Sequence, residues 1–321
     1  MRILILGTGP FAVPMFQSLL DSAHEIPALI TRPTPPPRGR EKASLNPMRD
    51  LALARGLPVH APESIHSPDA AALIASLAPD LFMVCDYGQI LSREVLALAP
   101  LGGINLHASL LPKYRGAAPI NWAIYHGEVE TGVSVIHMTP RLDGGPCLTV
   151  LRTPIAPDET APHLEHRLAQ LGIQAVFKAI ELLSHWDRQS AIGAIQDQAL
   201  ATKAPRLKKT DGAVNWSRSA AQIRNQVRAF QPWPGTYTHW LRCGGEPLRL
   251  ILDQVSLAPD SIAGRLPGEV VVGEGQRLII ATGGGALSLD VVQPAGKRVM
   301  PISEFLPGYP LRLGACFGEP A

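Results

Sequence analysis

The stretch Gly103 to Pro119 reads G-I-N-L-H-A-S-L-L-P-K-Y-R-G-A-A-P. Its first half alternates aliphatic and polar residues, so a β-strand here places Asn105 and His107 on one face, with aliphatic packing behind them. Its second half holds Pro112 and a Gly-Ala-Ala run before Pro119, which favour a tight loop. A strand that ends in a fixed loop beside two polar side chains predicts one wall of a binding site.

A third polar group follows in the L-D-G-G turn at Leu142 to Gly145, where glycines allow the backbone and the Asp143 carboxylate to approach a ligand closely. Amide, imidazole and carboxylate together suit acyl transfer to an amine, because the tetrahedral oxyanion needs a hydrogen-bond donor and the amine must lose a proton. A carboxylate beside the imidazole favours its charged form. The alternative is that Asn105 and His107 are buried polar residues satisfied by backbone groups.

These residues resemble a known family. The pattern N-x-H-x-S-L-L-P-x-Y-R-G followed by L-D-x-G is similar to the signature of the formyltransferases that use 10-formyltetrahydrofolate. Further stretches at Ala118 to Ile120, Arg228 to Gly235 and Gln293 to Met300 resemble motifs of the members that act on methionyl initiator tRNA. The resemblance therefore extends over nearly the whole chain.

The resemblance implies a reaction and a set of site residues. We expect transfer of the formyl group of 10-formyltetrahydrofolate to the α-amine of methionyl initiator tRNA, giving N-formylmethionyl-tRNA for translation initiation. Asn105, His107 and Asp143 match the catalytic trio of the family. The folate-contacting segment is matched by Ser109, Leu110, Leu111 and Pro112. The alternative within the family is a formyltransferase that acts on a small amine or a sugar.

The N-terminal turn keeps a different enzyme class open. A strand over Arg2 to Leu6 leads into Gly7-Thr8-Gly9-Pro10, and with Ala12 the turn fits the dinucleotide pattern G-x-G-x-x-A. An NAD site needs an acidic residue after the second strand, but Ala28 to Ile30 runs into Thr31-Arg32-Pro33. An NADP-dependent oxidoreductase is therefore a disfavoured alternative.

Two domains are expected. Apolar strands alternate with amphipathic helices up to about residue 183, which predicts a doubly wound, mostly parallel Rossmann-like sheet with the site at the carboxyl ends of its strands. Short strands later in the chain indicate a smaller β-rich domain, and the resemblance implies an OB-like barrel that binds tRNA. A structural or dimerisation role for this domain is the alternative. The expected ranges are 1–189 for the catalytic domain, 190–209 for a basic linker and 210–321 for the barrel.

Two basic clusters are candidates for tRNA contact, because lysine and arginine bind phosphates whatever the base sequence. The first lies on a proline-rich loop after the second strand and consists of Arg38, Arg40 and Lys42. The second, called here the connector cluster, consists of Lys203, Arg206, Lys208 and Lys209. Asp86, after the strand Asp80 to Cys85, is expected to cap the strand end, with a carboxylate near the folate as the alternative.

Composition sets the outer limits of the function. The chain has 321 residues, 46% of them hydrophobic and 17% charged, with a net charge of +2, so nucleic-acid contact must be concentrated in patches. No apolar run reaches membrane-spanning length and no signal peptide begins the chain, so we expect a cytoplasmic protein, acting as a monomer. The four cysteines lack metal or disulfide spacing, and His163, Glu165 and His166 are expected to be exposed, so no metal site is predicted.

Overall fold

The protein is described by a computed structural model that covers residues 1–33, 45–242 and 245–319. The chain divides into two compact units. The first comprises Met1–Pro119, Glu130–Pro154 and Leu164–Pro205, and the second comprises Ile120–Val129, Ile155–His163 and Arg206–Ala321. Two short segments that precede residue 164 thus belong to the unit that the C-terminal part builds.

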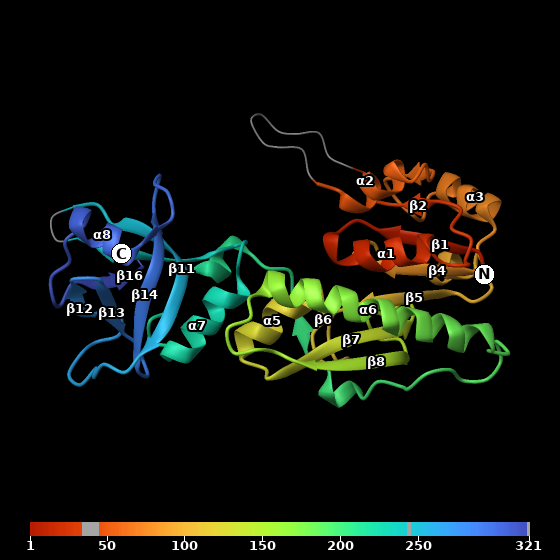
Figure 1. The fold of residues 1–321 in the computed structure, drawn as a ribbon. Coiled ribbons are helices and arrows are strands. Elements are labelled where there is room, and N and C mark those ends of the chain that lie inside the picture. Colours follow the sequence, from red (N-terminus) through yellow and green to blue (C-terminus); the bar gives the residue numbers. More distant parts are fainter. Residues whose placement is uncertain (34–44, 243–244, 320–321) are drawn as a thin grey trace. The chain divides into compact units, whose positions relative to one another are not determined.

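The first unit is organised around a seven-stranded sheet of order β3-β2-β1-β4-β5-β7-β8 (Figure 1). Strands β1 to β5 run parallel, β7 is antiparallel to β5, and β8 is antiparallel to β7. The strands are β1 Ile3–Gly7, β2 Leu29–Ile30, β3 Val59–His60, β4 Leu81–Cys85, β5 Gly103–His107, β7 Glu130–His137 and β8 Cys147–Pro154. The mostly parallel, doubly wound sheet confirms the predicted fold class.

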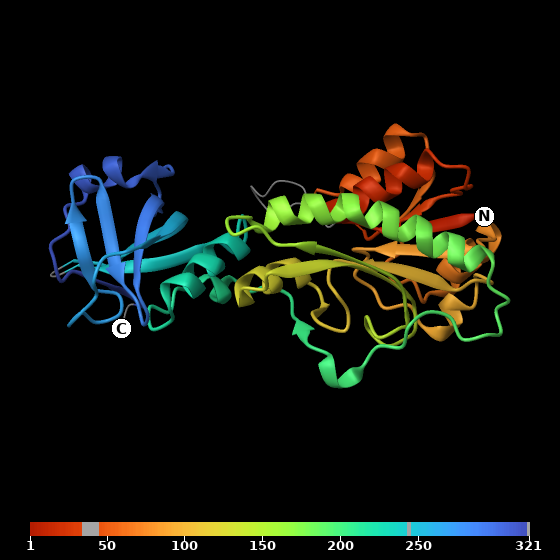
Figure 2. The same ribbon diagram turned by 60° about the horizontal axis from the view of Figure 1, so that its bottom comes forward.

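Helices cover both faces of this sheet. They are α1 Val13–Leu20, α2 Pro47–Ala54, α3 Pro68–Leu77, α4 Arg93–Leu96 and α6 Ala161–Ser184, with a 3₁₀ turn at Pro10–Ala12. On one face, Leu4 and Val84 pack with Ile74 of α3 and Val95 of α4. On the other, a Cβ on Gly172 of α6 would come within 2.7 Å of the Leu106 side chain, so this helix packs closely on β5. Figure 2 shows α6 running along the sheet.

A short pairing lies outside the main sheet of the first unit. Strand β6, Arg115–Gly116, pairs in parallel with β9, Lys203–Ala204. Arg115 N–H donates to the Thr202 carbonyl at 2.9 Å and Ala117 N–H donates to the Ala204 carbonyl at 2.8 Å. The segment before Pro205, which also carries the 3₁₀ turn Gln198–Leu200, is therefore bound to the loop that follows β5.

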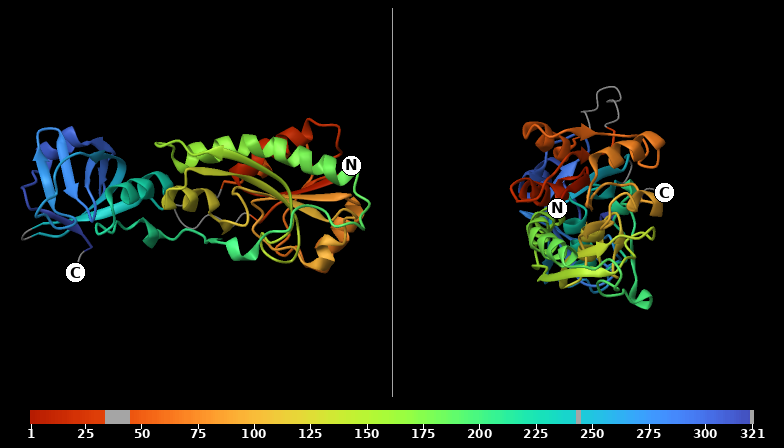
Figure 3. Two further views of the ribbon diagram at one scale, coloured as in Figure 1. Left: turned by 90° about the horizontal axis from the view of Figure 1, so that it is seen from below. Right: turned by 90° about the vertical axis from the view of Figure 1, so that its right-hand side faces the viewer.

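The second unit contains an antiparallel sheet of order β12-β13-β14-β11-β10-β16, with β15 beside β14. Figure 3 shows this sheet in cyan to dark blue. Its strands are β10 Thr236–Leu241, β11 Leu248–Ala258, β12 Val270–Glu274, β13 Arg277–Ala281, β14 Ala286–Pro294, β15 Met300–Pro301 and β16 Cys316–Gly318. The sheet curls until its two ends meet, since Glu269 before β12 bridges to Cys316 of β16. This closure gives the OB-like barrel that the resemblance implied.

Three helices accompany the barrel, together with a 3₁₀ turn at Lys209–Gly212. They are α5 Pro119–His126, α7 Ala220–Ala229 and α8 Ile302–Gly308. Helix α7 begins with a capping box, in which Ser219 and Gln222 bond each other's backbone N–H groups. Tyr125 of α5 stacks on Phe230 with ring centroids 5.1 Å apart, and the Asn121 amide donates to the Ala229 carbonyl at 2.7 Å. The α5 segment is thus held to α7 by both apolar and polar contacts.

Candidate active site

Strand β5 displays the two polar groups as the alternation predicted. Val84 of β4 is the register partner of Asn105, and Ser134 of β7 is the partner of His107. Ile104 and Leu106 are fully or almost fully buried on the opposite face. Asn105 is only half-buried, and its carboxamide makes no hydrogen bond with a described residue. The alternative of a backbone-satisfied Asn105 therefore fails, whereas His107 does bond to the backbone.

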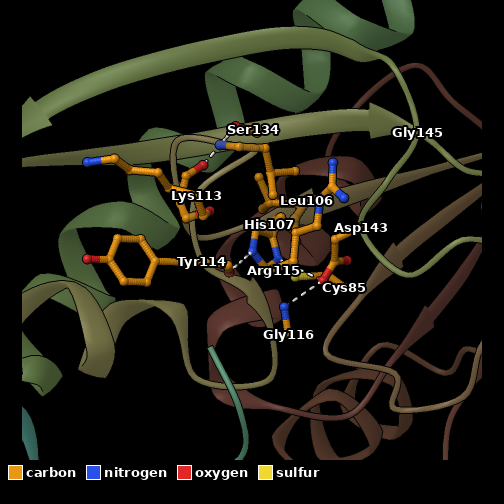
Figure 4. Close-up of polar contacts among 12 residues, drawn as sticks. Cys85, Leu106, His107, Lys113, Tyr114, Arg115, Gly116, Ser134, Asp143 and Gly145 are labelled. Atoms are coloured by element: carbon orange, nitrogen blue, oxygen red, sulfur yellow. Dashed lines mark hydrogen bonds and ion pairs between the residues drawn. The ribbon is translucent and has the colours of Figure 1, made fainter. Parts of the chain in front are cut away.

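The loop after β5 is fixed by its own polar groups. The Ser109 hydroxyl donates to the Lys113 carbonyl at 2.7 Å, and the Ser134 hydroxyl donates to the Ser109 carbonyl at 2.7 Å. Ser134 Oγ in turn accepts the Leu111 N–H at 3.1 Å. These bonds hold the loop against β7, so the carbonyl of Tyr114 comes to lie beside the imidazole (Figure 4).

His107 and Asp143 face each other in this site. His107 Nε2 lies 2.8 Å from the Tyr114 carbonyl oxygen, so Nε2 carries a proton and donates it to that carbonyl. The other ring nitrogen, Nδ1, lies 3.8 Å from Asp143 Oδ2. Both side chains are more than nine-tenths buried. The imidazole nitrogen Nδ1 and the Asp143 carboxylate therefore face each other at a position that is sheltered from solvent.

The turn that carries Asp143 is held in an uncommon conformation. Asp143 has a left-handed backbone with φ 47°, which costs a non-glycine residue on the order of 1–3 kcal/mol. Its Oδ2 accepts the N–H of Gly116 at 2.9 Å. A Cβ at Gly145 would lie 1.9 Å from the His137 carbonyl oxygen, so only glycine lets the turn approach β7 this closely. The turn brings Asp143 to the imidazole from 36 residues along the chain.

One residue joins this site that the sequence did not single out. Gln196, only 6% exposed, donates its amide hydrogens to the carbonyls of Asp143 at 2.8 Å and Gly145 at 2.7 Å. Its carbonyl oxygen accepts from the Arg115 guanidinium, with Nε at 3.1 Å. No local pattern distinguishes a buried glutamine in a predicted linker from an exposed one, so the sequence contained no signal for this contact.

Two family models match the chain. The model for "Formyl transferase" matches residues 1–180, which is more than half of the 321 residues. The model for "Formyl transferase, C-terminal domain" matches residues 206–310. The chain belongs to the formyl transferase family.

Known proteins of this family are similar over the full length of the chain. A methionyl-tRNA formyltransferase of Rhodopirellula baltica is 44% identical over 322 residues, covering 98% of this chain and 96% of the relative. One of Moorella thermoacetica is 42% identical over 319 residues, covering 99% of each. The solved structure of WlaRD, a sugar 3N-formyl transferase, superposes with a TM-score of 0.63 at 19% identity, covering 93% of this chain and 99% of that one. At that identity the likeness shows the shared formyl transferase fold.

In this formyl transferase the N-terminal glycine turn lies against a carboxylate. A Cβ at Gly9 would lie 2.5 Å from Asp86 Oδ2, and Thr31, where an NAD enzyme has an acidic residue, hydrogen-bonds to Asn46. A carboxylate beside the turn repels a pyrophosphate. Together with the family assignment, this removes the support for the oxidoreductase alternative.

Asp86 does not have the predicted capping role. Its carboxylate makes no hydrogen bond with a described residue, and its backbone is left-handed with φ 52°. Asp86 is exposed as a residue, but the protein around its carboxyl group partly desolvates it and raises its pKa to about 6. The negative charge of Glu165 raises this pKa further. Glu165 is itself half-buried, contrary to the expectation of an exposed position, and burial raises its pKa. Asp86 therefore lies at the carboxyl end of β4 without a hydrogen-bond partner among the residues that the structure describes.

The segment matched to folate contact divides into two kinds of residue. Ser109 and Leu111 are buried; the Ser109 hydroxyl bonds within the loop, and the Leu111 N–H bonds to Ser134 of β7. Leu110 and Pro112 are half-buried. A Cβ at Gly132 would lie 2.6 Å from the Leu110 side chain, so Leu110 packs over β7 while part of it stays accessible.

The predicted tRNA contacts are only partly described by the structure. Arg38, Arg40 and Lys42 lie outside the described residues. The four members of the connector cluster are all exposed, and none forms an ion pair with a described residue. They are Lys203, Arg206, Lys208 and Lys209. Their charges are therefore open to a polyanion.

Metal ligands, cysteines and membrane-spanning helices were assessed over the described residues. Within it, no group of three or more His, Cys, Asp or Glu side chains is placed to hold a metal ion, and His163 and His166 are exposed. Cys85, Cys147 and Cys316 are free thiols, while Cys243 lies outside the described residues. No helix there is both long and apolar enough to span a membrane.

Proposed function

We propose that this chain transfers the formyl group of 10-formyltetrahydrofolate to the α-amine of methionyl initiator tRNA, with Asn105, His107 and Asp143 around the reacting atoms. The observation that carries the proposal is the buried His107–Asp143 pair, with Nδ1 3.8 Å from Oδ2. Next to it Asn105, on the same face of β5, presents a carboxamide without a partner among the described residues. An amide donor beside a proton-holding pair is what acyl transfer to an amine requires.

Asn105 supplies the hydrogen-bond donor. When the amine attacks the formyl carbon, the formyl oxygen gains negative charge, and the Asn105 amide N–H stabilises this charge. Its donor capacity is available because no described residue uses it. His107 adds a second donor only from Nδ1 in its protonated form, since Nε2 already donates to Tyr114.

Asp143 and His107 together accept the proton that the attacking amine loses. A new C–N bond forms between the amine and the formyl carbon, and the nitrogen becomes positively charged until its proton passes to the Asp143–His107 pair. The bond from the formyl carbon to N10 of the folate then breaks, and N10 takes up a proton as tetrahydrofolate leaves. The Gly116 N–H and the left-handed turn hold the carboxylate in place for this transfer.

The residues of the 109–112 segment fit a folate. We propose that Leu110 and Pro112, which are half-buried, contact the cosubstrate, while Ser109 and Leu111 keep the loop in shape from within. A partly exposed apolar surface beside a polar site suits a flat heteroaromatic ring. Bound there, 10-formyltetrahydrofolate supplies the activated formyl group.

We further propose how the two basic clusters hold the tRNA and where in the cell the protein acts. The connector cluster contacts backbone phosphates of the acceptor stem, and Arg38, Arg40 and Lys42 approach its end. A catalytic domain over 1–189, a basic linker over 190–209 and a tRNA-binding barrel over 210–321 divide these tasks. In this proposal the protein acts in the cytoplasm and as a monomer.

The test measures formyl transfer directly. The purified chain is incubated with 10-formyltetrahydrofolate and either methionyl initiator tRNA, methionyl elongator tRNA or a nucleotide-linked amino sugar. Rapid formylation of the initiator tRNA is expected, with elongator tRNA a poorer substrate and the amino sugar unmodified. Preference for the amino sugar would overturn the proposal in favour of a small-substrate formyltransferase. Replacing Asn105 by alanine should lower kcat about 10²- to 10³-fold.

A further inference from the structure

The amide of Gln196 uses its full hydrogen-bonding capacity between two parts of the site. Nε2 donates both hydrogens, one to the Asp143 carbonyl at 2.8 Å and one to the Gly145 carbonyl at 2.7 Å. Oε1 accepts from Arg115 Nε at 3.1 Å and from Nη2 of the same guanidinium. Because carbonyls surround the nitrogen and donors surround the oxygen, only one orientation of the amide satisfies the contacts.

We propose that Gln196 is a positioning residue for formyl transfer, which holds the Asp143 carboxylate at His107 without touching either substrate. This inference rests on the proposed function and extends it to a segment between the two matched family regions, which end at residue 180 and begin at residue 206. Gln196 is more than nine-tenths buried, so its amide acts through the turn that it braces.

The turn needs such a brace because its conformation is unfavourable on its own. The left-handed backbone of Asp143 persists only where the surroundings fix it. The turn's own contribution is one bond, from Gly144 N–H to the Arg141 carbonyl at 3.1 Å. Gln196 binds the carbonyls of Asp143 and Gly145, so it fixes the peptide plane directly after Asp143 and anchors the turn a second time after Gly145.

The same glutamine also fixes the other partner of the carboxylate. Asp143 Oδ2 accepts the N–H of Gly116, the residue after Arg115. Arg115 is bound by Gln196 through its side chain and by Thr202 through its backbone N–H. The donor and the acceptor of the Gly116–Asp143 bond are therefore both tied to Gln196. Loosening this residue would affect both ends of that bond at once.

The expected kinetic result is a loss of turnover with little loss of substrate binding. Displacing a reacting group by about 1 Å costs on the order of 10²-fold in rate. Because Gln196 does not contact either substrate in this proposal, KM for each substrate should stay within about threefold of the wild-type value. A residue that merely supported the fold would instead change the stability and leave kcat of the folded enzyme intact.

The test compares three full-length variants. Gln196→Leu removes both functions of the amide, whereas Gln196→Glu keeps the acceptor for Arg115 and replaces the donors by an oxygen that repels the two carbonyls. Gln198→Leu is the matched control, because Gln198 accepts from Arg115 Nη1 at 2.9 Å and donates to the Gln196 backbone carbonyl at 3.1 Å, but none of its bonds to described residues reaches the Asp143 turn. The measurements are kcat, KM for both substrates and the unfolding temperature.

Both Gln196 variants should lose about 10- to 100-fold in kcat with KM unchanged, while Gln198→Leu stays near the wild type. Wild-type kcat in Gln196→Glu, or an equal loss in Gln198→Leu, would overturn the proposal even if Gln196→Leu does not fold. A wild-type protein without formyl transfer would instead refute the proposed function, so the two failures are distinguishable.

Discussion

The charge of Asp143 is the feature whose removal should affect the reaction most. Asp143→Asn keeps the size of the side chain and an oxygen able to accept the Gly116 N–H, but it removes the charge that faces the imidazole. Oδ2 and His107 Nδ1 are 3.8 Å apart. At this distance two opposite unit charges attract each other by about 4 kcal/mol at an effective dielectric constant of about 20. If this attraction is present only when the pair holds the substrate proton, kcat falls by about 10³-fold.

The assay is single-turnover formylation of methionyl initiator tRNA, which isolates the chemical step from product release. The matched control is the unfolding temperature, which shows whether the variant keeps the fold. A folded Asp143→Asn protein with a rate within threefold of the wild type would refute the reasoning. It would show that the proton leaves the amine without help from the buried pair.

Three further results are expected. The pKa of Asp86 is raised from 3.8 to about 6, so its carboxyl favours the folded state below about pH 4 and this contribution is lost as the pH rises through 6. Asp86→Asn should therefore unfold less readily than the wild type at pH 7 by about 1 kcal/mol, allowing for solvent screening, and denaturant titrations at pH 4 and 7 measure the difference. Gly145→Ala should lose most of its activity, because its Cβ would lie 1.9 Å from the His137 carbonyl oxygen; a fully active variant would contradict the turn geometry. Replacing the connector cluster by alanine should weaken initiator and elongator tRNA alike and flatten the salt dependence of binding, and an unchanged salt slope would exclude phosphate contacts by these residues.

The predictable part of the site is local in sequence. Asn105 and His107 lie two residues apart on a strand, so the period of the side chains alone places them on one face. The glycines of the L-D-G-G turn predict a close approach of the backbone to neighbouring atoms. The structure shows such an approach between Gly145 and the His137 carbonyl. The alternation of strands and helices that builds the mostly parallel sheet was likewise predicted from apolar periodicity.

The unpredicted part depends on distant contacts. Strand β8, at Cys147–Pro154, and helix α5, at Pro119–His126, were not predicted, because each lies next to a motif whose turns and prolines dominate the local pattern. Gln196 bonds to Asp143 across 53 residues, and a hydrogen bond of that span leaves no periodicity to detect. Asp86 was assigned a capping bond from its position alone, and the structure places it against Gly9 without such a bond to any described residue.

The pairing of β6 with β9 has a consequence for any attempt to take this protein apart. A fragment cut after residue 189, where the composition begins to resemble a linker, would lose Gln196, Thr202 and the whole of β9. The N–H groups of Arg115 and Ala117 would then lose their partners next to the Asp143 carboxylate. A transplantable catalytic module must therefore include the chain through Pro205, and chimeras with foreign RNA-binding domains should be joined beyond that point.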